Sequence, residues 1–219
     1  MFCVYKDGAV VKTMRGNQWF ITDTGDKQPP TIFKLWSREE LATLDIYHFT
    51  DNSKKSGYDN DFYVMGATVD SVPNQSNGEV IRTSIPVERN VDAVRAVIKG
   101  KITKMRSTVA HDGVVYMDKN FTTDRQTVES INLIAVELSD DAEVPWDTMD
   151  TEKVPTEVFT MTGAEFKGLR DAIAAHYLAC TVQTRVHIDA VDAKRTFNTV
   201  TSYDYTTGWP VNPDRSEPD

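Results

Sequence analysis

The chain has 219 residues, of which 40% are hydrophobic and 26% are charged, within the range of ordinary folded domains. This composition excludes collagen-like, low-complexity and wholly disordered chains, because the apolar content is large enough to bury a core. Its 24 Lys and Arg residues against 33 Asp and Glu residues give a net charge of −9. That balance disfavours sequence-independent binding to nucleic-acid phosphates, which requires clustered cations.

The first part of the chain predicts short strands and turns. Residues 2–5 and 9–11 flank Lys6-Asp7-Gly8, and Asp-Gly favours the positive backbone angle of a tight hairpin. Ser37 and Glu40 have the spacing of a capping box and predict a short helix over residues 38–43. A further strand and a strand pair are predicted at residues 18–22, 62–69 and 79–85.

From Pro86 onward the pattern changes to helices. Asn90 is the expected cap of a helix over residues 90–110, whose apolar stripe is Val91, Val94, Ile98, Ile102, Met105 and Val109. A β-hairpin is predicted over residues 113–122. Thr123 and Gln126 then have capping-box spacing and predict a second amphipathic helix, with apolar positions at Val128, Ile131, Ile134, Ala135 and Leu138.

The last part of the chain contains the longest predicted helix. Residues 144–156 include Pro145, Trp146 and Pro155, so we expect an irregular segment with strand pieces that end at Met161. Thr162 and Glu165 form a third capping box, and the helix runs from Gly163 to about Phe197. Its apolar stripe is Phe166, Leu169, Ile173, Tyr177, Cys180, Thr184, Ile188 and Val191.

These elements predict an α+β fold, with a small β-rich N-terminal part followed by a helical domain with short β-hairpins and a long C-terminal helix. We expect three parts: residues 1–85, residues 86–203, and an acidic, Pro-rich tail over residues 204–219. Only two cysteines, Cys3 and Cys180, are present, which favours buried or reduced thiols over a disulfide framework. Residues 1–8 lack a secretory signal pattern, and no apolar run approaches the roughly 18 residues that cross a bilayer. We therefore expect synthesis in the cytosol and no membrane insertion.

The four histidines, His48, His111, His176 and His187, form no metal signature. His176 and His187 are eleven residues apart on one predicted helix, about 16 Å along its axis, which is too far for one zinc ion. Surface decoration or a hydrogen-bonded core imidazole is the favoured interpretation. Asp59-Asn60-Asp61 and Asp147 to Asp150 offer oxygen ligands for calcium, but neither completes a binding loop, and solvated turns are favoured.

The sequence likewise gives little indication of nucleophilic catalysis, of nucleic-acid binding or of sugar binding. Cys180 and His176 are four residues apart on a helix and can touch, although an inert buried cysteine fits the apolar stripe better. The basic cluster Lys99, Lys101, Lys104 and Arg106 is interpreted as a solvated helix face. Trp19, Trp36, Trp146 and Trp209 are dispersed, which favours core or interface positions over a sugar-binding platform. We predict no catalytic, cofactor-binding or metal-binding residue, and the partner-binding residues are unknown.

The segment from about Val94 to Val191 resembles a domain of unknown function that is common in tailed-bacteriophage proteins encoded near tail-fibre genes. The resemblance lies in an ordered series of pieces: residues 97–106, 121–124, 125–127, Trp146, 159–166, 174–176 and 187–190. Trp36, Ser37, Glu40 and Leu41 are similar in style to phage tail-associated proteins, whereas residues 78–89 represent the usual companion segment only loosely.

This resemblance implies a structural component of a phage tail, associated with the tail fibre or baseplate, and brings no catalytic residues. It implies that residues 1–85 form an attachment or fibre-contact domain, or else part of the same fold. It also implies a trimer or hexamer in the virion tail, after synthesis in the host cytoplasm. The long helix is the expected subunit contact. Three alternatives remain: a non-virion tail-fibre assembly chaperone, an unrelated binding module, or a hydrolase with Glu165 and Asp171 as its carboxylates.

Overall fold

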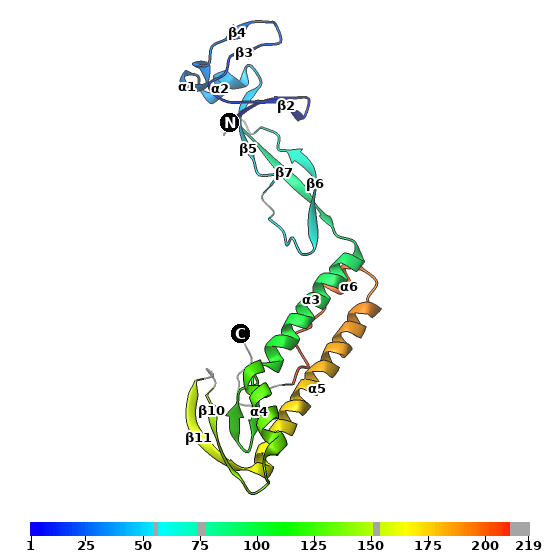
Figure 1. The fold of residues 1–219 in the computed structure, drawn as a ribbon. Helices are drawn as coiled ribbons and strands as arrows, with labels where there is room; N and C mark the ends of the chain where they lie inside the picture. Colours follow the sequence, from blue (N-terminus) through cyan, green and yellow to red (C-terminus); the bar gives the residue numbers. More distant parts are fainter. Residues whose placement is uncertain (55–56, 74–77, 151–153, 211–219) are drawn as a thin grey trace. The chain divides into compact units, whose positions relative to one another are not determined.

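The computed structural model describes residues 1–54, 57–73, 78–150 and 154–210. The chain divides into two compact units, Met1–Arg89 and Asn90–Asp219. Strands dominate the first unit, while the second contains helices, short hairpins and one long helix (Figure 1). The predicted α+β class is therefore confirmed.

The first unit begins with the predicted hairpin. Strands β1 (Phe2–Lys6) and β2 (Ala9–Met14) pair antiparallel. Asp7 and Gly8 connect them with φ values of 52° and 85°, as the Asp-Gly turn requires.

Three further strands complete a five-stranded sheet in the order β2-β1-β5-β7-β6. Strand β5 (Ile46–Asp51) pairs antiparallel with β1 and parallel with β7 (Glu79–Glu88), and β6 (Tyr63–Asp70) pairs antiparallel with β7. The predicted strand pair is confirmed, with β7 extending beyond its expected end.

Small elements cover one end of this sheet's core. They are the hairpin β3 (Phe20–Ile21) and β4 (Lys27–Gln28), followed by α1 (Ile32–Leu35) and α2 (Arg38–Ala42). The predicted capping box of α2 is confirmed, because the backbone N–H of Glu40 donates to Ser37 Oγ (3.1 Å) while Glu40 Oε2 accepts from the backbone N–H of Ser37 (2.7 Å). The buried residues beneath are Phe2, Val4, Met14, Phe20, Ile32, Phe33, Leu41 and Ile46.

A largely buried carboxylate, whose side chain is 10% exposed, links the two edge strands of the sheet. Asp70 in β6 accepts two hydrogen bonds from the guanidinium of Arg82 in β7, at 2.7 and 2.9 Å. Its Oδ2 also accepts the backbone N–H of Val10 in β2, at 3.1 Å. The bonds from Arg82 lower the pKa of the Asp70 carboxyl. This bidentate pair has the geometry of a strong charge-assisted interaction.

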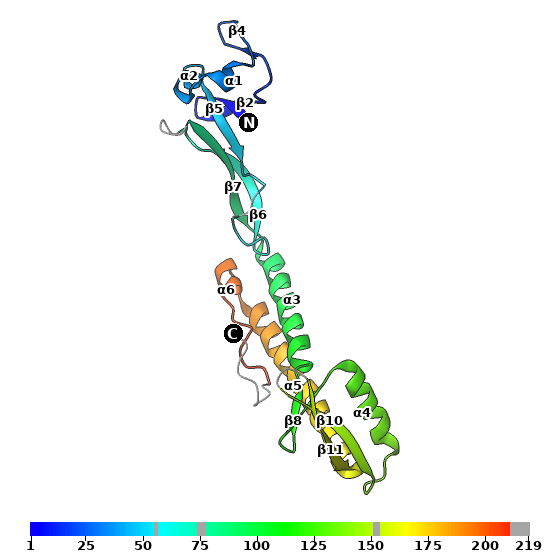
Figure 2. The ribbon, with the colours of Figure 1, turned by 90° about the vertical axis from the view of Figure 1, so that its left-hand side faces the viewer.

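The second unit is built on two long helices. In both views, α3 (Val91–Ala110) and α5 (Gly163–Ala193) lie side by side and run in opposite directions (Figure 1 and Figure 2). The shorter α4 (Arg125–Glu137) packs against α5, and α6 (Phe197–Thr201) packs against α3. Asn90 caps α3 as predicted, since its Oδ1 accepts the backbone N–H of Ala93 at 2.9 Å.

Two hairpins accompany these helices. The predicted hairpin is formed by β8 (Val114–Tyr116) and β9 (Lys119–Phe121). The expectation of an irregular segment around Pro145 is wrong, because β10 (Glu143–Met149) pairs with β11 (Pro155–Thr162). Proline is tolerated there because each strand of a two-stranded sheet has an edge outside the ladder.

Hairpins and helices share one apolar core beside the first half of α5. Trp146 of β10 packs edge-on against Phe166 of α5, with ring centroids 5.2 Å apart. The buried members of this core are Phe121, Ile131, Ala135, Val144, Met161, Phe166, Leu169 and Ile173. Of the predicted apolar stripe of α4, Val128, Ile131, Ala135 and Leu138 face this core, whereas Ile134 is exposed. The predicted capping box of Thr162 and Glu165 is present at the start of α5.

The cap of α4 differs from the prediction by one residue. Asp124, not Thr123, is the N-cap, and its Oδ1 accepts the backbone N–H of Thr127 at 3.0 Å. Thr123 is buried instead, where its hydroxyl donates to the Ala110 carbonyl (2.7 Å) and accepts from the Gly113 N–H (3.0 Å). It therefore joins the end of α3 to the first hairpin, and the expected capping box is absent.

The C-terminal part of the chain also differs from the prediction. Helix α5 stops at Ala193, where Lys194 turns extended and its carbonyl accepts hydrogen bonds from Arg95 of α3. The expected tail over residues 204–219 is wrong for its first part, because Trp209 is buried and stacks on His187 of α5 with centroids 5.1 Å apart. Residues 211–219 lie outside the described part of the chain.

The substitution Ile173→Asp tests the inner face of α5. Ile173 is buried in the core of the second unit, so an unpaired carboxylate there should cost at least about 4 kcal/mol of unfolding free energy. Ile188→Asp should cost less because Ile188 is only half-buried. Urea unfolding followed by circular dichroism measures both, with Leu133→Asp, whose side chain is 75% exposed, as the matched control. Equal urea midpoints for Ile173→Asp and the control would contradict this helix face.

The substitution Asp70→Asn tests the link between the edge strands. Because the folded-state pKa of Asp70 lies below the unfolded value of about 3.9, the carboxylate stabilises the fold fully above that pH and loses this effect as pH falls through the folded pKa. The variant should therefore lose about 2 kcal/mol near neutral pH, and the difference from wild type should shrink below about pH 4. Urea unfolding at several pH values measures this, with exposed Glu39→Gln as control; a pH-independent difference would contradict it.

Candidate functional site

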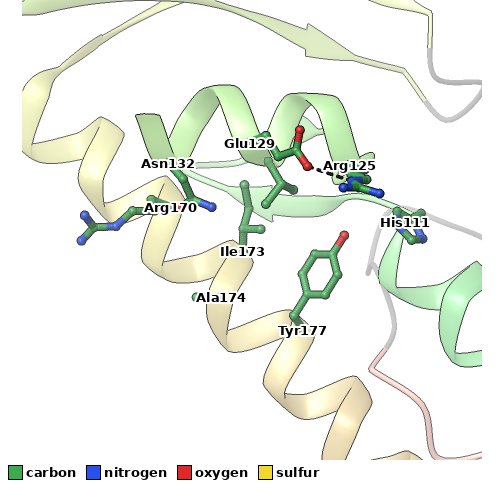
Figure 3. Close-up of a pocket in the computed structure, with 9 residues that line it drawn as sticks. His111, Arg125, Glu129, Asn132, Arg170, Ile173, Ala174 and Tyr177 are labelled. Atoms are coloured by element: carbon green, nitrogen blue, oxygen red, sulfur yellow. Dashed lines mark hydrogen bonds and ion pairs between the residues drawn. The ribbon is translucent and has the colours of Figure 1, made fainter. Parts of the chain in front are cut away.

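A groove of about 370 Å³ lies in the second unit between α4, α5 and the end of α3. Its apolar wall comes from α5, with Ile173, Ala174 and Tyr177, and its polar wall comes from α4 and His111 (Figure 3). The lining of α4 is Arg125, Val128, Glu129 and Asn132. Tyr177 is fixed in place because its hydroxyl donates to the Thr123 carbonyl at 2.8 Å.

The charged groups of the groove are engaged with one another or with neighbours. Arg125 donates to Glu129 at 2.8 Å, four residues along the same helix. Arg170 pairs with Asp171 at 2.8 Å, and its guanidinium extends away from the other labelled side chains in Figure 3. His111 Nδ1 bonds the Ser107 carbonyl at 2.6 Å. The groove therefore offers shape, an aromatic ring and an amide, and its carboxylate, Glu129, is paired with Arg125.

The groove was not predicted from the sequence. Its only local signal is the spacing of Arg125 and Glu129, and that spacing is ordinary for an exposed helix face. The contribution of Arg170, Tyr177 and His111 depends on how α3, α4 and α5 pack together.

The structure brings His176 and Cys180 together, with Nε2 and Sγ 3.8 Å apart. However, His176 Nε2 also lies 3.0 Å from the Val109 carbonyl oxygen. Because a carbonyl only accepts, that nitrogen carries a hydrogen and does not take the thiol proton. Burial raises the pKa of Cys180 as well. Both observations support the interpretation as an inert core cysteine.

His187 is a hydrogen-bonded core imidazole, one of the two roles considered from the sequence. Its Nε2 bonds the Thr207 carbonyl at 3.0 Å, and its Nδ1 bonds the Tyr203 hydroxyl at 2.7 Å. The ring thus ties the segment after α6 to α5. Among the residues that the structure describes, no group of three or more His, Cys, Asp or Glu side chains is placed to hold a metal ion.

The two carboxylates considered for hydrolysis have structural partners. Glu165 accepts hydrogen bonds from the backbone N–H (2.8 Å) and hydroxyl (3.0 Å) of Thr162, which lower the pKa of its carboxyl. Asp171 pairs with Arg170. The two residues are six positions apart on one helix, about 240° around its axis, so they do not share a face.

The remaining candidates serve local structure. Asp59 Oδ1 accepts the backbone N–H of Asp61, and Asp150 Oδ1 accepts that of Val154, both at 2.8 Å. In the basic cluster, Lys99 pairs with Asp192 of α5 at 2.6 Å. The pKa of His48 is lowered, chiefly by burial.

The tryptophans form no common platform. Trp209 is buried, Trp146 packs on Phe166, and Trp19 is exposed beneath Lys27 at 5.0 Å. No helix in the described ranges is long and apolar enough to cross a membrane.

The second unit is thus a helical-hairpin module with two small β-hairpins and a groove that has an apolar wall and a polar wall. Residues 93–207, slightly more than half of the chain, match the family described as "Domain of unknown function (DUF4376)". The chain belongs to this family. No curated protein and no solved structure matches the chain. The family region extends through residue 207, and it includes Tyr203 and Thr207, which hydrogen-bond to His187.

The reactivity of the two thiols tests whether Cys180 is an inert core cysteine or part of a Cys-His site. Cys3 and Cys180 are buried, and burial raises the pKa of Cys3 to about 11 and that of Cys180 in the same direction. We expect neither to react with iodoacetamide in the native protein at neutral pH, and both to react in urea. Peptide mass spectrometry measures the labelling, with the unfolded chain as control. Rapid native labelling of Cys180 would revive a Cys-His site.

Proposed function

We propose that this protein is a structural component of a bacteriophage tail, associated with the tail fibre or baseplate, and that it acts by docking to other virion proteins. Its partners are other tail, baseplate or fibre proteins and further copies of itself, in a trimer or hexamer. It is made in the host cytoplasm and resides in the virion tail, without an enzymatic activity or a cofactor.

The observation that carries this proposal is the grouping of exposed apolar side chains. In the first unit, the ribbon of β6 and β7 exposes Val64, Met65, Val69, Ile85 and Val87. In the second unit, α4 exposes Leu133, Ile134 and Val136, and α5 exposes Leu178, Val182 and Val186. Grouped apolar side chains at a surface are typical of contacts with other proteins.

Electrostatics and chemistry support docking over other activities. The net charge of −9 disfavours contact with nucleic acid. Glu165 and Asp171 are engaged in a cap and an ion pair, which disfavours the hydrolase alternative. The ordered resemblance of residues 94–191 to proteins encoded near tail-fibre genes supplies the phage context.

A second candidate is a tail-fibre assembly chaperone that binds its client in the infected cell and is absent from particles. The same exposed apolar faces favour it, because a chaperone needs an accessible surface for an incomplete partner.

Quantitative mass spectrometry on purified particles of the encoding phage separates the two candidates. A tail component should be present at a fixed multiple of three or six copies per particle, because tails have cyclic symmetry. A major capsid protein of known copy number serves as the internal standard. Presence only in the infected-cell lysate would contradict the structural role and support the chaperone.

A further inference from the structure

Helix α5 has a continuous outer face that no described residue covers. Along it, Leu178, Val182 and Val186 are 65%, 56% and 52% exposed. The nearby Ala174, Ala175 and Ala179 are exposed as well. The segment that packs on His187 lies across the helix from this face, because His187 is nine residues from Leu178 and thus about 180° around the axis.

The charges on this face are arranged in reversed order about Leu178. Asp171 lies seven residues before it and Arg185 seven residues after it, so all three are nearly aligned along the helix. Eleven residues away in each direction lie Lys167 and Asp189. Reading outward from Leu178, each side thus presents a charge that is opposite to the charge at the same distance on the other side.

We propose that this face binds a second copy of the same chain, with the two α5 helices antiparallel and a twofold axis at Leu178. In that arrangement Leu178 meets Leu178, Asp171 faces Arg185, and Lys167 faces Asp189, each pair occurring twice. An isologous contact requires such self-complementarity. A parallel pair would instead place Asp171 beside Asp171 and Arg185 beside Arg185, which is repulsive.

The ion pairs that these charges form within one chain do not prevent them from pairing with a second copy. Asp171 pairs with Arg170 and Arg185 pairs with Asp189, both at the surface and within the same helix. Lys167 pairs with the largely exposed Asp140. Exposed ion pairs of this kind contribute little, so replacing them with pairs between copies carries a small cost. The alanines beside Leu178 let the helix backbones approach closely.

This inference deepens the self-association that the proposed function includes, and it does not require the location in a tail. An isologous contact gives even copy numbers, so of the trimer and hexamer proposed above it selects the hexamer, built from dimers. It is tested on the purified full-length chain, whereas the tail function is tested on particles, so failure of one is distinguishable from failure of the other.

Cysteine cross-linking tests the position of the axis. Leu178→Cys should give a disulfide-linked dimer under mild oxidation, because the two copies of residue 178 meet at the axis. Val182→Cys should not, since its two copies are about 12 Å apart along the axis in this arrangement. The buried native cysteines give no background. Equal cross-linking of both variants, or of neither, would overturn the proposed register.

Charge reversal tests the pairing without adding thiols. Sedimentation equilibrium over a range of concentrations should give a dimer for wild type, and Asp171→Arg and Arg185→Asp should each weaken it at least about tenfold. The double variant should restore the dissociation constant to near the wild-type value, which only direct pairing explains. Circular dichroism verifies that each variant is folded. A wild-type chain that stays monomeric at all concentrations, or a double variant as weak as the singles, would overturn the proposal.

Discussion

The inner face of α5 is the constraint on which the second unit depends. Different neighbours cover successive parts of it: the hairpin of β10 and β11 and helix α4 at the start, α3 along its length, and Trp209 near the end. A helix of 31 residues is about 46 Å long, so no single neighbour in a unit of this size covers it. The elements of the unit are therefore held mainly through their separate contacts with one helix.

The polar links of this unit keep those elements in register along α5. Lys99 pairs with Asp192, Arg95 bonds the Lys194 carbonyl, and His176 bonds the Val109 carbonyl. Each bond joins α3 to α5 or to the turn that follows it, and together they run from one end of the helix pair to the other. Apolar packing alone tolerates sliding of one helix along another, whereas these bonds specify one alignment.

Much of the fold was predictable because its signals are local. Asn90, Ser37 and Thr162 each cap a helix through a bond to a residue three positions on, so spacing alone identifies them. Thr123 and Asp124 show the limit of such reasoning. Either is a good cap by type, and Thr123 is excluded only because tertiary packing buries its hydroxyl between α3 and the first hairpin.

The other differences also arise from long-range contacts. Val144, Trp146 and Thr148 alternate inward as a strand requires, but Pro145 between them is typical of an irregular segment until β11 is known to lie beside it. Trp209 lies between Gly208 and Pro210, which are typical of a turn or a tail, and its packing on the ring of His187 on α5 explains its burial.

The surfaces that carry function are the least visible in the sequence, since exposure is a property of the folded chain. The groove exists because Arg125, Tyr177 and His111 arrive from three helices. On α5, Leu178 and Val182 lie outside the apolar stripe predicted from the sequence, but their apolar type alone does not show whether another element covers them. Helices α3 and α4 and the hairpins pack against one side of α5, and the opposite side is left exposed. The reversed order of Asp171 and Arg185 about Leu178 acquires meaning at that point, because charges on a free apolar face determine which partner, and in which direction, the face accepts.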